Sequence, residues 1–159
     1  NHPNVASCRI CLALVYLQQG KKSAIKLAEQ AVQSDLQNFG ESHPEIAWKY
    51  NVLGMCYLML RDVKNAEEAC IKSLRLTSKH FGEQSTNTGQ VLYTLAQTYF
   101  YTKQYQKAKD TLLRYDNIMR HQIGKNYPFL QNVQKMVQQC EMEILTQKGG
   151  EWLNNLFGN

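Results

Sequence analysis

The chain has 159 residues, of which 43% are hydrophobic and 19% are charged, a balance typical of a folded globular protein rather than a disordered one. Its formal net charge of +5 permits an acidic partner without requiring one, because the basic residues are spread along the chain. No apolar run reaches the roughly 18 residues that a transmembrane helix needs, so no membrane partner is expected.

Short motifs recur along the chain at a nearly fixed spacing. His2-Pro3 returns as His43-Pro44, and glycines recur every 42 residues as Gly40, Gly82 and Gly124. A fixed period of this size indicates stacked copies of one supersecondary unit, so function is sought on a surface rather than in a pocket. The repeats are expected at about 2–42, 43–84 and 85–126.

Each repeat reads as two amphipathic helices separated by a short break. A large residue followed by a small one recurs as Leu12-Ala13, Leu53-Gly54 and Leu95-Ala96, and the small residue lets a neighbouring helix approach closely. Prolines at positions 3, 44 and 128 suit a first helical turn, and glycines at positions 40, 82 and 124 suit a left-handed cap. Ser85-Thr86 takes the place of His-Pro, since either hydroxyl can cap a helix. The predicted helices cover 4–18, 21–38, 44–60, 63–80, 86–102, 105–121 and 128–147.

The helix predicted at 128–147 differs from the other first helices. Its apolar stripe includes Phe129, Val133 and Cys140, but Gln138 stands where the small residue of the other repeats falls. A second helix therefore has no place to pack. We expect this helix to cap the last repeat and to complete an array over residues 1–148.

Residues 149–159 are predicted to form a separate amphipathic tail. Gly149-Gly150 is expected to stop the preceding helix, and the large apolar residues that follow form two i,i+4 pairs: Trp152, Leu153, Leu156 and Phe157. Two helical turns do not hold alone in water, so the tail must dock or stay mobile. It could cover its own last repeat, insert into a neighbouring molecule to give self-association or autoinhibition, or be an added peptide.

The sequence holds five cysteines, an odd number scattered through the helical patterns. Such usage favours reduced thiols and a cytoplasmic location over a disulfide framework. Cys8 and Cys11 have metal-ligand spacing, but no second pair accompanies them, so no metal and no cofactor are expected. The chain opens inside a repeat, which suggests a piece of a longer protein.

The repeat columns resemble the tetratricopeptide repeat. The 42-residue period and the joint Gly40-Glu41-Ser42-His43-Pro44 are similar to the kinesin light chains. The resemblance implies an all-α, right-handed α-solenoid of about three helix pairs plus a capping helix, whose first helices line a concave groove for partner peptides. Position by position, it places residues of the first helices at the groove, and the expected binding residues among them are Trp48, Asn51, Met55, Gln90, Tyr93, Gln97 and Phe100.

These residue types suit the binding of an extended peptide. Asn and Gln both donate and accept, so Asn51, Gln90 and Gln97 can bond the main chain of a peptide. Trp48, Met55, Tyr93 and Phe100 can supply the large contact area that carries most binding energy.

The expected function is therefore that of a non-catalytic scaffold or adaptor for a protein or peptide partner. The first helices carry no basic column, so no nucleic-acid partner is expected, and the histidines at the helix joints lack a neighbouring nucleophile. One alternative is a structural subunit that assembles through its tail. The other is a repeat domain at the C-terminal end of a larger protein, an enzyme or a ubiquitin-ligase receptor.

Overall fold

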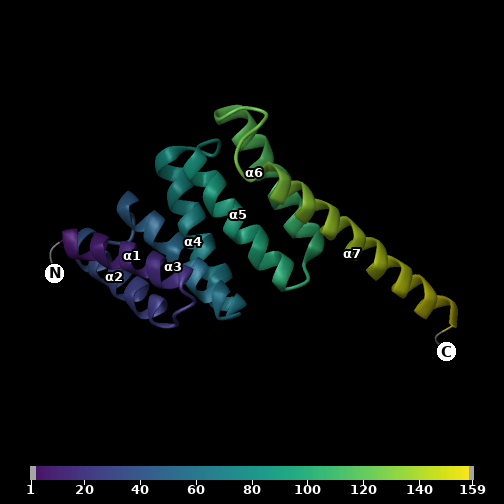
Figure 1. Cartoon of the computed structure of the whole chain (residues 1–159), viewed down its shortest axis with the longest axis horizontal. Helices are drawn as coiled ribbons and strands as arrows, with labels where there is room; N and C mark the ends of the chain where they lie inside the picture. Colours follow the sequence, from purple (N-terminus) through teal and green to yellow (C-terminus); the bar gives the residue numbers. More distant parts are fainter. Residues whose placement is uncertain (1–2, 158–159) are drawn as a thin grey trace.

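The computed structural model describes the backbone of residues 3–157 and the side chains of residues 5–150. All regular structure in this range is α-helical, in the order α1 (Pro3–Gln18), α2 (Ser23–Phe39), α3 (Pro44–Met59), α4 (Val63–Phe81), α5 (Thr86–Tyr101), α6 (Tyr105–Gln122) and α7 (Leu130–Phe157). Three helix pairs, α1–α2, α3–α4 and α5–α6, stack side by side, and α7 packs on the last pair (Figure 1). The predicted right-handed α-solenoid is confirmed.

Each first helix ends at a residue in the left-handed region. Gly20, Arg61 and Lys103 occupy the same column of the repeat, with φ of 67°, 59° and 60°. The next backbone N–H then bonds back to the preceding turn, as from Asp62 to the Tyr57 carbonyl at 3.0 Å. This turn reverses the chain, so that the second helix packs against the first.

Side chains at the joints cap the helices as expected. The imidazole Nδ1 of His43 accepts from the Glu45 N–H at 3.3 Å, and Pro44 occupies the first turn of α3. The Ser85 hydroxyl accepts from the Thr88 N–H at 3.2 Å at the start of α5. Gly40 and Gly82 have the positive φ that was predicted, but with extended ψ of 168° and 154°, so they lead the chain straight into the next joint rather than forming a left-handed cap.

Small side chains form much of the interior between the helices. Ala6, Ala13, Ala24 and Ala28 are fully buried in the first helix pair. In the second pair, a Cβ placed on Gly54 would lie 2.7 Å from the Cys70 sulfur of α4. The small-residue column therefore sets the close spacing between the two helices of a repeat.

The last helix corrects two predictions. Pro128 was expected in its first turn, but α7 begins only at Leu130, after Phe129 with a φ of 72°. Gly149-Gly150 was expected to end the helix near residue 147, but α7 continues to Phe157 (Figure 1). Each glycine weakens a helix by about 1 kcal/mol relative to alanine. That cost alone does not end the helix here, because neither a proline nor a capping turn follows the two glycines. The backbone at Trp152, Leu153, Leu156 and Phe157 is thus helical, but their side chains lie outside the described residues.

Candidate functional site: a hollow between α3 and α5

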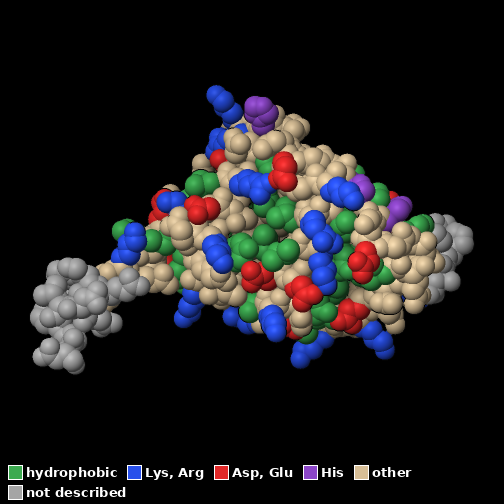
Figure 2. Space-filling model, turned by 180° about the vertical axis from the view of Figure 1, so that it is seen from behind, with side chains coloured by type: hydrophobic (Ala, Val, Ile, Leu, Met, Phe, Trp, Pro, Cys, Tyr) green, Lys and Arg blue, Asp and Glu red, His purple; other side chains and the backbone are tan. Residues whose placement is uncertain are grey.

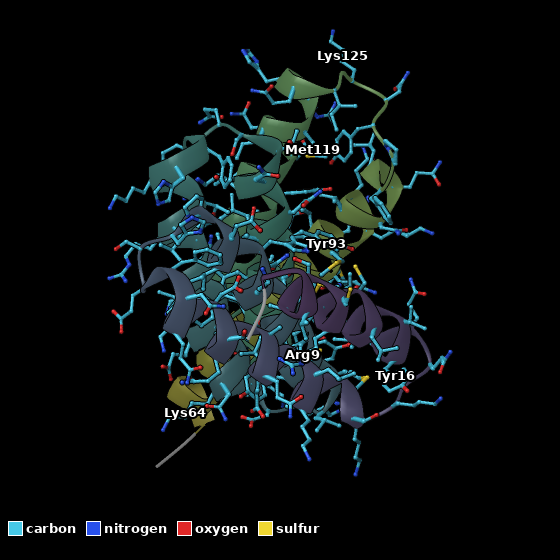
Figure 3. All side chains as sticks on the ribbon, turned by 90° about the vertical axis from the view of Figure 1, so that its left-hand side faces the viewer. Arg9, Tyr16, Lys64, Tyr93, Met119 and Lys125 are labelled. Atoms are coloured by element: carbon cyan, nitrogen blue, oxygen red, sulfur yellow. The ribbon has the colours of Figure 1, made fainter. Side chains whose placement is uncertain are left out.

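A hollow of about 200 Å³ lies between the first helices of the second and third repeats. Helices α3 and α5 supply most of its wall, α6 and the turn before α7 supply the rest, and Tyr93 at its edge is labelled in Figure 3. The lining residues are Trp48, Asn51, Met55, Gln90, Tyr93, Thr94, Tyr115 and Phe129. Five of the seven predicted groove residues therefore surround one space.

Asn51 is the most deeply placed polar group of the hollow. The residue is only 1% exposed, and its Oδ1 finds no hydrogen-bond donor among the residues that the structure describes. A buried acceptor without a partner is costly, by about 1–3 kcal/mol. The Oδ1 atom is itself closed off from solvent, so a bound N–H group reaches it only if the neighbouring side chains move.

Aromatic rings form the apolar wall around this acceptor. Trp48 is 43% exposed, while Tyr93 is half-buried with its ring centroid 5.2 Å from Tyr115 and 6.5 Å from Phe129. Burial raises the pKa of the Tyr93 hydroxyl, so the ring stays neutral at physiological pH. The wall is therefore uncharged, and the rings of Trp48 and Phe129 are both exposed to a ligand.

Sequence reasoning missed Thr94, Tyr115 and Phe129. Tyr115 lies on the second helix α6, in a column where the other repeats carry the small residues Ala31 and Ser73. A Cβ on Gly89 would make only ordinary van der Waals contact with the Tyr115 ring at 3.7 Å, so the tyrosine does not depend on a glycine at that point of α5. The exchange of a small residue for tyrosine was a usable signal. Phe129 gave none, because its position depends on its left-handed backbone.

Gln97 and Phe100 lie farther along α5, away from this hollow. Gln97 lines a second depression with Leu58, Tyr101 and Met55, and Met55 also borders the first hollow. The two depressions therefore adjoin. Phe100 packs edge-to-face on Tyr105 with ring centroids 5.5 Å apart, and it borders a third depression that includes Lys135 of α7.

The described residues carry little of the chemistry that catalysis needs. Side chains 5–150 contain no group of three His, Cys, Asp or Glu residues that could hold a metal ion. Burial raises the pKa of the Cys56 thiol to about 11 and that of Cys70 to about 12, so both stay protonated and poorly nucleophilic.

On the face seen in Figure 2, basic and acidic side chains alternate without a single-sign patch. None of the described helices combines the length and the apolar character that crossing a membrane demands.

Comparison with known proteins agrees with this architecture. Residues 45–120 match the model of the tetratricopeptide repeat. This part of the chain is similar to the tetratricopeptide repeat family. The expected resemblance to that family is thereby confirmed, and the fold is one that generally mediates protein–protein interaction and typically serves non-catalytic scaffolds.

Solved structures extend the tetratricopeptide fold to the rest of the chain. Crystal structures of the nearly identical TPR-like repeats of a protein described as a kinesin light chain from Podosopora anserina superpose with TM-scores of 0.80 and 0.81 at 22% and 21% identity, over 98% of this chain and 74% of theirs. The structure of BtubC (BKLC) from P. vanneervenii gives a TM-score of 0.73 at 22% identity, over 100% of this chain and 68% of its own. No curated protein matches the chain.

Proposed function

We propose that this chain is a non-catalytic interaction module that binds an extended segment of a partner protein along its first helices. The observation that carries the proposal is the hollow between α3 and α5, in which an unpartnered buried acceptor sits among aromatic side chains. An adaptor or scaffold role in the cytoplasm agrees with the absence of disulfides at all five cysteines.

The two parts of the hollow suit the two parts of a peptide. A peptide N–H can donate to the Asn51 Oδ1 once the side chains that cover this atom move aside, whatever the neighbouring peptide side chains are, which gives affinity without sequence preference. A large apolar side chain beside that N–H can enter between Trp48 and Tyr93, where desolvation of aromatic rings contributes most of the binding energy. Gln90, exposed at the rim, and Gln97 beyond Met55 can bond further main-chain groups of the same segment.

A random peptide library displayed on phage is the probe that tests this proposal. The full chain should select peptides that share a large apolar residue, with micromolar affinity that is typical of such grooves. Trp48→Ala and Asn51→Ala should each weaken a selected peptide by about tenfold or more. Thermal unfolding should change little for Trp48→Ala, because its side chain is 43% exposed.

Ile71→Ala and Leu113→Ala are matched controls, since both side chains are apolar, are nearly half exposed, and lie on the second helices α4 and α6. They should leave the affinity unchanged. Peptides that bind wild type, Trp48→Ala and Asn51→Ala equally well, while Ile71→Ala weakens them, would move the binding surface to the second helices and refute the proposal.

A further inference from the structure

Each interior first helix turns one face toward the second helix that precedes it. We call this the leading face; it comprises Ile46, Lys49, Leu53 and Cys56 in α3, and in the same columns Thr88, Val91, Leu95 and Thr98 in α5. The ammonium group of Lys49 lies 2.5 Å from the Asp35 carboxylate of α2, and Thr98 shares a side-chain hydrogen bond with Cys70 of α4. All eight residues are buried.

The leading face of α1 is bare and apolar. Its residues in the same columns are Val5, Cys8, Leu12 and Val15. Leu12 is 41% exposed, whereas Leu53 and Leu95 in its column are 7% and 4% exposed. Val5 and Val15 are likewise 42% and 45% exposed, and Cys8 is exposed. Figure 3 is viewed from the end of the molecule at which α1 lies, with Arg9 and Tyr16 labelled on this helix.

We propose that the leading face of α1 docks the second helix of a further tetratricopeptide repeat, which extends the array ahead of α1. The spacing of Val5, Cys8, Leu12 and Val15 is that of one stripe along a helix, and the same stripe is covered by a second helix at each interior joint. The docked helix continues an interface that the molecule already builds twice, between α2 and α3 and between α4 and α5.

The chemistry of this stripe specifies which kind of second helix fits. Asp35 of α2 pairs with Lys49 of α3. In α1 the equivalent of Lys49 is Cys8, so a docked helix with a carboxylate at the position of Asp35 would bury that carboxylate without a partner. Helix α4 carries the neutral Thr77 in the column of Asp35. The partner helix therefore resembles α4, with small or neutral residues along its contact face.

A second copy of the chain offers no such helix. Its second helices α2, α4 and α6 are each already covered by α3, α5 and α7. The outward face of α7 presents the exposed polar residues Gln131, Gln134 and Gln138, and only farther along the exposed apolar residues Met142 and Leu145, so it lacks an apolar stripe as long as that of α1. Each matched crystal structure is also longer than the part that this chain covers, so the fold accommodates further units.

The test extends the full chain by one repeat and uses Cys8 as a reporter. A copy of residues 43–84, with both of its own cysteines replaced by serine, is joined ahead of His2, so that a helix with the sequence of α4 apart from that cysteine precedes α1 in the natural register. Cys11→Ser removes the other exposed thiol of α1, while Cys56, Cys70 and Cys140 are buried. The reaction of Cys8 with Ellman's reagent should slow by about tenfold or more in the extended chain, because the docked helix covers the thiol.

The matched control is the same extended chain with Leu12→Lys and Val15→Lys. These positions are already exposed in the unextended chain, so circular dichroism should show its fold intact, and Cys8 should react as fast as without the added repeat. An added repeat that fails to fold on α1, seen as an undiminished rate at Cys8 in the extended chain, overturns the proposal. So does a dimer of the unextended chain in light scattering that Leu12→Lys dissociates, because a second copy would then be the partner.

Discussion

The two ends of this array differ in the surface that each leaves uncovered. At one end, α1 leaves its leading face bare, and that face is apolar. At the other end, α7 leaves the opposite face uncovered. In α3 the equivalent face contacts α4, the second helix of the same repeat. There the Ala47 carbonyl accepts from the Ser73 hydroxyl at 2.6 Å, and Gly54 lies beside Cys70. In α7 these columns hold Gln131 and Gln138, and both are exposed. The face left uncovered at α1 is therefore apolar, while these two columns of the face left uncovered at α7 are polar.

The residues at which the first helices end differ between the two ends in the same way. Gly20, Arg61 and Lys103 take a left-handed conformation that reverses the chain after each first helix. The corresponding residue of α7 is Leu145, which stays helical, so α7 continues to Phe157 instead of turning back (Figure 1). Helix α7 thus neither turns back after Leu145 nor offers the small residues against which a second helix packs in the other repeats.

The largest effect is expected where a leading face is covered and charged. Lys49 is 4% exposed and Asp35 is fully buried, so Lys49→Met leaves a buried carboxylate without its partner. The free energy of unfolding should fall by about 3–5 kcal/mol in urea denaturation, and the double variant Lys49→Met with Asp35→Leu should recover most of it.

The same column at the bare end provides the control. Cys8→Ala should change the free energy of unfolding by less than about 0.5 kcal/mol, because Cys8 is exposed on α1. Equal losses at Lys49 and Cys8 would show that the two leading faces do not differ in burial, against the structure.

A smaller difference is expected in the leucine column. Leu53→Ala removes a side chain that is 7% exposed and should cost about 2–5 kcal/mol, while Leu12→Ala at 41% exposure should cost below about 1 kcal/mol. Urea denaturation of the two variants and of Leu95→Ala measures this directly. A loss at Leu12 as large as that at Leu53 would mean that the leading face of α1 is covered within the chain itself.

Much of this fold could be predicted from the sequence because the repeat makes each column visible three times. The joints were predictable from His43, Pro44 and Ser85, whose caps act locally and need no tertiary context. The end of α7 could not be predicted in this way. Gly149-Gly150 signals the end of a helix only where the chain can turn, and the residue in the turn column is Leu145, four positions earlier, which stays helical.

The candidate site was predictable only in part. Trp48, Asn51 and Tyr93 follow from their columns on the first helices, but the 1% exposure of Asn51 depends on how its neighbours pack around it. Tyr115 reaches the hollow from α6, where the other repeats carry Ala31 and Ser73, so its place in the hollow belongs to one repeat and not to a shared column.

The smallest effect is expected at the free end of α7. Gly149 and Gly150 are exposed, and a Cβ at either would meet no atom within 4 Å, so Gly149→Ala with Gly150→Ala should stabilise this part of the helix by about 1 kcal/mol per site. Amide hydrogen exchange over residues 145–157 should slow several-fold, with the global unfolding free energy unchanged, because few contacts tie this segment to the helix pairs. Gly54→Ala is the contrast, since its Cβ would lie 2.7 Å from the Cys70 sulfur and should destabilise the second repeat. If the alanines at 149 and 150 left exchange unchanged, the continuous helix beyond Leu145 would be wrong, and the array would be closed by the polar face of α7 alone.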